Sequence, residues 1–213
     1  MKNGGRNLLF LILWLGSLAI TLSSLVYFNS EERAPFVIEK LPLAWEGLYV
    51  LLLRIHVVSA SLALPGCLIL TSQSILKRWP KFHRYCGRVV GFVVIFGLVP
   101  TGFYLAFYAR GAWPGTLGFL LTGAIALGAM LKAIAKARAG QYAEHRRFAW
   151  HVLGQLSVAV TSRAMLFGLE SFNFDPDFAY LLSLWVPVLG TFAFVEILHL
   201  SKKPFPFFLK EAR

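Results

Sequence analysis

The sequence lacks the short motifs that mark most soluble enzymes. It contains no P-loop, no glycine-rich dinucleotide-binding fingerprint, no G-x-S-x-G nucleophile turn and no H-E-x-x-H metal motif. Cysteine is also scarce: Cys67 and Cys86 are the two in the chain, and both fall in or beside apolar segments. A disulfide framework is therefore not expected, and both thiols are predicted to pack as small apolar side chains.

Acidic residues are few, because 10 Asp and Glu stand against 21 Lys and Arg for a net charge of +11. Such a balance can indicate a nucleic-acid partner, but 57% of the residues are hydrophobic, against about 45–50% in a soluble domain. The apolar residues recur in long blocks, each sufficient to cross a bilayer core of about 30 Å. No stretch remains for a separate soluble domain. The composition thus predicts one membrane-embedded domain over residues 1–213.

Hydrophobic runs and turn signals predict an all-α, polytopic bundle of six transmembrane helices. Pro80 suits the first turn of one helix, and Pro176 follows the turn residues Asn173 and Asp175 before another. The first apolar run lacks a small-residue cleavage pattern, so it is expected to be a retained helix. The predicted helices are residues 8–28, 47–74, 80–108, 114–135, 142–169 and 178–200.

The charged residues are distributed unequally between the two predicted sides of the membrane. Sixteen of the 21 lysines and arginines fall on the side that holds both chain ends. The positive-inside rule makes that side cytoplasmic, so both termini are expected in the cytoplasm. Orientation and contact with anionic lipids on the cytoplasmic side then account for the net charge, and no nucleic-acid partner is expected.

Two ionisable residues fall inside predicted spans. His56 in the second helix and Arg163 in the fifth lie at similar depth, a few residues outward of the helix midpoints. A charge at the centre of a membrane helix costs about 2.5–3.5 kcal/mol even on a lenient scale, so such residues mark functional sites. The two side chains are expected to meet inside the bundle and to bind a proton, an anion or a cofactor.

A second group of histidines and arginines lies near the predicted cytoplasmic ends. His83-Arg84 opens the third helix, and His145-Arg146 precedes the fifth, with His151 one to two turns further in. An imidazole can ligate haem iron, and a guanidinium can hold a haem propionate. His83, His145 and His151 are therefore candidate iron ligands for haem b; the same layer also suits a quinone headgroup. The alternative is a basic collar that contacts lipid headgroups and sets topology.

Two smaller patterns carry less weight. Glu196 and His199, at i and i+3 near the end of the last helix, are expected to form an interfacial pair. His83, Cys86 and His145 match no zinc-site spacing.

The order of these residues resembles a known family. His56, His83-Arg84-x-x-Gly87-Arg88, a glycine-rich helix, His145-Arg146-Arg147 and Arg163 together resemble the bacterial membrane proteins of domain of unknown function 2306. The resemblance covers about residues 50–170 and leaves the first and last helices outside. It implies a helical bundle in a bacterial inner membrane. It supports His56, His83, Arg84, His145, Arg146 and Arg163 as site residues, and it implies no activity. The sequence departs from the expected pattern at Phe148-Ala149 and at His151.

Three functions follow as hypotheses. The first is a b-type haem- or quinone-associated electron-transfer subunit. The second is a small proton- or anion-coupled transporter built on His56 and Arg163. The third is a structural or assembly subunit of a larger membrane complex or homo-oligomer, in which none of these residues does chemistry.

Overall fold

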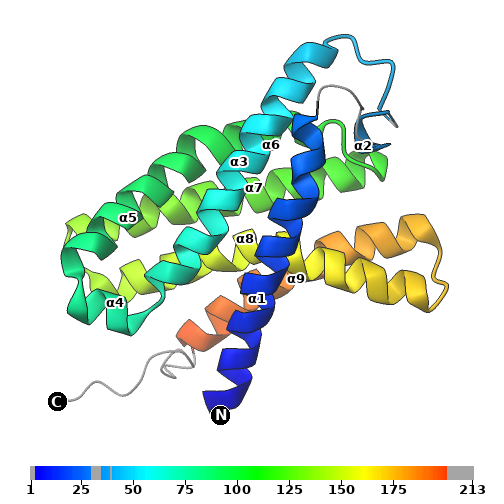
Figure 1. Cartoon of the computed structure of the whole chain (residues 1–213). Coiled ribbons are helices and arrows are strands. Elements are labelled where there is room, and N and C mark those ends of the chain that lie inside the picture. The colour runs from blue at the N-terminus through cyan, green and yellow to red at the C-terminus, as the bar shows by residue number, and fades with distance from the viewer. Residues whose placement is uncertain (1–2, 30–34, 39, 201–213) are drawn as a thin grey trace.

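The computed structural model describes residues 3–29, 35–38 and 40–200, and it confirms six helical spans long and apolar enough to cross a membrane (Figure 1). The predicted basic tail beyond residue 200, Lys2 and the side chain of Arg6 lie outside this description. The elements are α1 (Asn3–Ser23), η1 (Ser24–Phe28), α2 (Pro35–Ile38), α3 (Glu46–Leu70), α4 (Gln73–Arg78), α5 (Pro80–Phe92), η2 (Val93–Leu98), α6 (Val99–Ala106), α7 (Ala112–Arg138), α8 (Tyr142–Ser171) and α9 (Pro176–Leu200).

Helix α8 lies at the centre of the bundle. It packs most extensively against its chain neighbours α7 and α9, and it also contacts α3 and α1. Helix α3 packs in turn against α5, η2 and α6. The start of α1, helix α4, the turn between α7 and α8, and the end of α9 lie toward one end of the molecule (Figure 1). We call this the basic end, because the described lysines and arginines of the predicted cytoplasmic side lie on α4, the start of α5, the end of α7 and the start of α8.

Small residues allow α3 and α5 to approach closely. A Cβ atom built on Gly66 would lie 2.5 Å from Cγ2 of Val90. Cys67, beside Gly66, is buried in the same core, and Cys86 packs against that core half-buried. Both cysteines are free thiols. The glycine therefore permits a helix contact that any side chain would obstruct, as in other membrane bundles.

The third span is not the continuous α-helix predicted over residues 80–108. Between α5 and α6, η2 is a π-helical segment of six residues, Val93–Leu98. Pro100 is the second residue after this segment; it has no N–H to donate, and its ring would clash with the carbonyl of Phe96 four residues earlier in a regular helix. A π segment is the wider turn that accommodates such a residue, and it is frequent at functional sites.

The second span also ends before the predicted residue 74. Helix α3 stops at Leu70, and Ser72 caps the separate short helix α4. The Ser72 hydroxyl accepts a hydrogen bond from the Ile75 amide at 3.4 Å. Serine at this position satisfies a free amide at a helix start, which explains why the chain turns here although its hydropathy continues.

A buried polar bridge joins α7, α8 and α9. Gln155 is 4% exposed. Its carbonyl accepts a hydrogen bond from Thr122 at 2.5 Å, and its amide donates to the Val188 carbonyl and to Thr191, each at 3.1 Å. A buried polar side chain needs such partners, so this glutamine is fully engaged in holding three helices together.

Candidate cofactor site

The imidazole of His145 is fixed by the backbone of a neighbouring helix. Its Nδ1 lies 2.9 Å from the carbonyl oxygen of Ala133 on α7. A carbonyl only accepts, so Nδ1 carries the hydrogen and Nε2 carries the lone pair. Histidines that ligate metals commonly donate their other ring N–H to a carbonyl in this way. His145 is thus in the tautomer that leaves Nε2 available as a ligand.

His83 on α5 lies close enough to His145 for the two rings to interact electrostatically. The side chain is half-buried, and its Nδ1 is buried without a hydrogen-bond partner in the part of the chain that the structure describes. Buried polar atoms normally have a partner. The fold therefore brings together the two histidines that open the third and fifth spans, and one of them carries an unsatisfied nitrogen.

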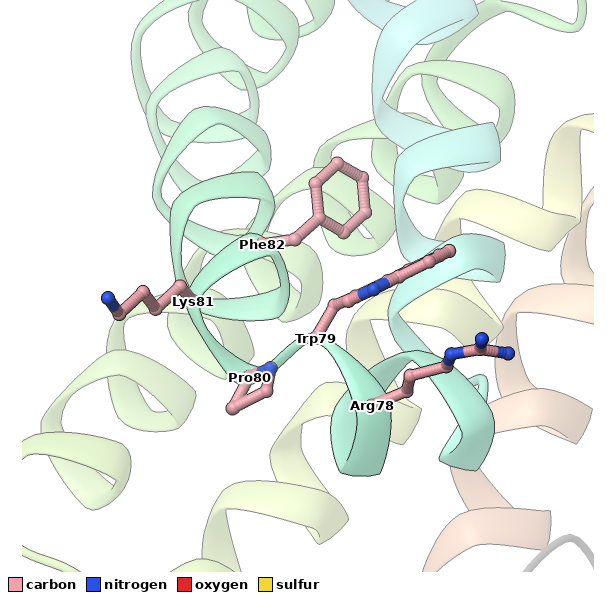
Figure 2. A pocket seen from close by; sticks show the side chains of 5 residues that line it. All are labelled: Arg78, Trp79, Pro80, Lys81 and Phe82. Atoms are coloured by element: carbon pink, nitrogen blue, oxygen red, sulfur yellow. The ribbon is translucent and has the colours of Figure 1, made fainter.

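The arginines beside these histidines differ in exposure. Arg84 is exposed, whereas Arg146 is half-buried. A shallow surface pocket lies close by in sequence, at the start of α5, lined by Arg78, Trp79, Pro80, Lys81 and Phe82 (Figure 2).

Within this pocket Arg78 lies over the Trp79 ring at 5.7 Å, while Lys81 points away from both (Figure 2). Basic and aromatic side chains together are typical of a membrane–water interface. Contact with anionic lipid here stays a prediction.

His151 lies in a different setting from His83 and His145. It is buried, and its Nε2 is 2.6 Å from a carboxylate oxygen of Glu196 on α9. Among the described residues, no group of three or more His, Cys, Asp or Glu is placed to hold a metal ion. A haem iron needs only two axial ligands, and of the three candidate histidines His83 and His145 interact electrostatically with each other.

His56 lies in the other half of the bundle, against η2 and α6. Its Nδ1 is 3.1 Å from both the Leu98 carbonyl and the Thr101 hydroxyl. Thr101 donates its own hydrogen to the Gly97 carbonyl at 2.6 Å, so Nδ1 of His56 is the donor and Nε2 has the lone pair. A Cβ on Gly102 would lie 3.1 Å from the ring, so this glycine makes room for the imidazole.

Arg163 does not meet His56 directly, as the sequence had led us to expect. Its side chain is exposed, and its guanidinium donates to the Ala159 carbonyl of its own helix at 2.8 Å. It is near enough to His56 and to Tyr180 on α9 to interact with both electrostatically. The two residues are therefore neighbours in one region without a hydrogen bond between them.

The expected pairing of Glu196 with His199 is wrong. Glu196 accepts hydrogen bonds from Arg147 and His151, and His199 lies 3.9 Å from Glu144. The sequence signal that points to this cluster is Glu196 itself, a carboxylate within the last apolar span, which needs a cationic partner from a neighbouring helix.

The sequence also matches a known protein family. The family model described as "Predicted membrane protein (DUF2306)" matches residues 53–199. The chain belongs to this family. No curated protein and no solved structure matches the chain.

The DUF2306 match reaches further than the expected boundary near residue 170. It includes nearly all of α9, with Glu196 and His199. The expectation that the last helix lies outside the family is therefore wrong. Every candidate site residue from His56 to Arg163 also falls within the matched range.

Proposed function

We propose that this DUF2306 protein is an electron-transfer subunit that binds a b-type haem at its basic end, between His83 and His145. The proposal rests on the hydrogen bonding of the two imidazole rings. His145 holds its Nδ1–H on the Ala133 carbonyl and leaves Nε2 free, and the nearby His83 has a buried nitrogen without a partner among the described residues. Two imidazoles from different helices are the ligand set of many b-type haems.

The chain's own residues have distinct tasks in this proposal. Ala133 orients one ligand, and the start of α5 positions the other. Arg84 and Arg146 follow the two histidines directly in sequence, and they would neutralise the haem propionates. The haem would supply one-electron chemistry when bound. We further propose that the basic end faces the cytoplasm, as the positive-inside rule favours.

The first test is an optical spectrum of the detergent-purified protein, oxidised and then reduced with dithionite. We expect a Soret band that shifts on reduction and is lost in His83→Ala and in His145→Ala. His199→Ala is the matched control, because His199 belongs to the same end but to another cluster, and it should keep the band. A featureless spectrum of folded wild-type protein after expression with added haem would contradict the proposal. Co-purification with a large partner in that case would favour the assembly role.

A second candidate function, proton- or anion-coupled transport, is favoured by one specific observation. Arg163 is exposed within a span and lies near His56, whose Nε2 lone pair is not used by Leu98 or Thr101. An intramembrane arginine normally faces a partner, a cavity or a ligand. A monoanion that still carries a proton would offer an acceptor to Arg163 and a donor to His56.

If this second function is correct, Arg163→Gln should reduce proton-linked anion flux into liposomes about tenfold or more, as expected for loss of an ionic contact worth over 1.4 kcal/mol. Arg110→Gln is the control, since Arg110 is exposed in the turn between α6 and α7 and pairs with Asp177 at the start of α9. A normally folded Arg163→Gln protein with unchanged flux would remove this candidate.

A further inference from the structure

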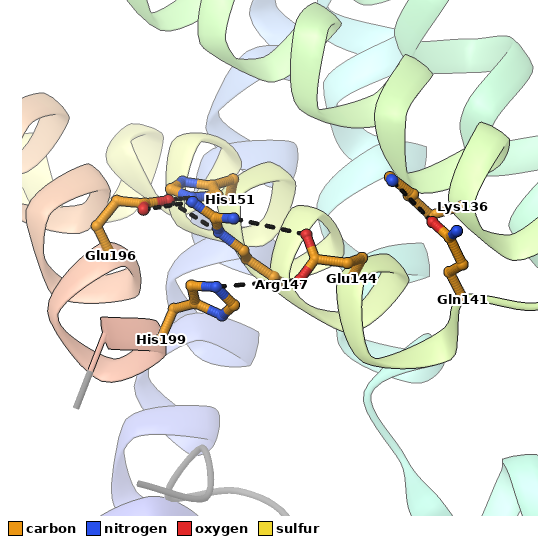
Figure 3. Close-up of polar contacts among 7 residues, drawn as sticks. All are labelled: Lys136, Gln141, Glu144, Arg147, His151, Glu196 and His199. Atoms are coloured by element: carbon orange, nitrogen blue, oxygen red, sulfur yellow. Dashed lines mark hydrogen bonds and ion pairs between the residues drawn. The ribbon is translucent and has the colours of Figure 1, made fainter. Parts of the chain in front are cut away.

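A chain of ionisable side chains joins α8 to α9 near the basic end (Figure 3). Arg147 donates to both oxygens of Glu196, at 3.2 and 2.5 Å, and His151 reaches the same carboxylate at 2.6 Å. Glu144 lies 3.5 Å from Arg147 on its other side, and His199 lies 3.9 Å from Glu144. The five residues therefore form one connected cluster of two carboxylates, one guanidinium and two imidazoles.

His151 is the buried end of this cluster. Its side chain is 4% exposed, whereas those of Glu144 and His199 are 34% and 35% exposed. The rings of Phe148 and Phe192 flank it, with centroids 6.4 and 4.9 Å away. The cluster thus leads from an accessible edge to an imidazole enclosed by aromatic side chains.

The hydrogen bonds indicate which ring nitrogen of His151 carries the hydrogen. The Glu196 carboxylate is held by the Arg147 guanidinium in a two-pronged contact, which favours the ionised carboxylate. An ionised carboxylate only accepts, so Nε2 of His151 carries the hydrogen and Nδ1 carries the lone pair. That Nδ1 is buried and has no partner in the described part of the chain. This nitrogen can therefore accept one more proton.

The charge of the cluster favours that proton. With both imidazoles neutral, Glu144, Glu196 and Arg147 sum to one net negative charge, and one added proton makes the cluster neutral. A net charge within a membrane protein's interior is costly. An imidazolium at His151 would also lie directly beside the Glu196 carboxylate.

The other helices packed on α8 add few charges near His151. From α7, Lys132 lies over the Phe148 ring at 5.3 Å; Lys136 is hydrogen-bonded to Gln141. From α3, Arg54 bonds the Tyr27 carbonyl, and His56 bonds the Leu98 carbonyl, both in the other half of the bundle. On α1 the ionisable residue is Arg6, whose side chain lies outside the description. Within the cluster, the Glu196 carboxylate thus favours the added proton, and the charges of Arg147 and of a protonated His199 oppose it.

We propose that the His151–Glu196 pair is a proton-binding site, in which Nδ1 of His151 takes up one proton from the aqueous phase at the basic end. Glu144 and His199 form its accessible edge, and Arg147 keeps Glu196 ionised and oriented. The site does not depend on a cofactor between His83 and His145. It gives the protein a buried group whose charge depends on the pH at the basic end.

Nuclear magnetic resonance of the full chain in nanodiscs, with ¹³C,¹⁵N-labelled histidine, tests this directly. Ring shifts distinguish the two neutral tautomers from the imidazolium, and loss of signals in His151→Gln assigns the residue. We expect His151 to be neutral with hydrogen on Nε2 at alkaline pH, and to become an imidazolium as the pH is lowered. His56 is the internal control, because its hydrogen bonds require the opposite tautomer, with hydrogen on Nδ1.

Two variants separate the proposal from a merely structural contact. Glu196→Gln should lower the affinity of His151 for a proton about tenfold or more, because it removes an adjacent opposite charge. Glu144→Gln, which leaves the direct contact intact, should lower it less. If Glu196→Gln does not fold, Glu144→Gln still gives the readout. A His151 ring that keeps one protonation state throughout, or that carries hydrogen on Nδ1 when neutral, would overturn the proposal.

Discussion

Replacement of Arg147 by methionine is expected to lower the free energy of unfolding by about 3–5 kcal/mol, the cost of leaving a largely buried charge without its partner. The side chains of Arg147 and Glu196 are 23% and 24% exposed. Methionine keeps much of the aliphatic length but leaves the Glu196 carboxylate with His151 as its one remaining interhelical donor among the described residues. Reversible unfolding of the purified protein in mixed micelles would measure the loss.

The chain provides a matched control for this substitution. Arg110 also pairs with a carboxylate on α9, that of Asp177 at 3.0 Å, but the two side chains are 51% and 74% exposed. Exposed ion pairs contribute about 0–1 kcal/mol, so Arg110→Met should be nearly neutral. The double variant Arg147→Met/Glu196→Met should recover much of the loss, because removing both charges is far less costly than removing one. Equal effects of Arg147→Met and Arg110→Met would show that burial is not the deciding factor.

Gly66→Ala is expected to destabilise the bundle by about 1–3 kcal/mol, the usual cost of overpacking a core. The added methyl group would lie 2.5 Å from Cγ2 of Val90. Valine is stiff about its first side-chain torsion in a helix, so it cannot easily turn aside. Thermal unfolding in detergent should show a lower midpoint temperature.

The control for Gly66→Ala is the same change at Gly128. A Cβ there meets nothing within 4 Å, and alanine is the better helix former by about 1 kcal/mol. Gly128→Ala should therefore stabilise the protein or leave it unchanged, opposite in sign to Gly66→Ala. Adding Val90→Ala should relieve the Gly66→Ala defect. If the two glycine variants behaved alike, close packing at Gly66 would not explain the effect.

Hydropathy predicted the six helical spans well but not the rotation of each helix about its axis. The six spans were predictable because twenty apolar residues in a row have few alternatives to crossing the bilayer. The interruption at η2 was not, since its residues are as apolar as their neighbours; Pro100 was the one signal. Likewise Ser72 begins the separate helix α4 by capping its first turn, which hydropathy does not register.

The difference between predicting a span and predicting the rotation of its helix also explains where the candidate site residues lie. His83 and His145 were expected at one end of the bundle, and the structure brings them close. His56 and Arg163 were predicted at similar depth, yet the Arg163 guanidinium bonds its own helix. The partner of His151 could not be predicted, because Glu196 lies 45 residues further along the chain and only the packing of α8 on α9 shows that they face each other.

The central position of α8 also has a consequence for how the protein is made. Helix α8 is the fifth of the six spans to leave the ribosome, yet α1 and α3 both pack against it. A side chain on Gly16 of α1, for example, would collide with Val160 of α8. The faces of α1 and α3 that meet α8 must therefore rest against lipid or the insertion machinery until more than two-thirds of the chain has been synthesised. The packing of α1 and α3 is therefore completed only after α8 has entered the membrane.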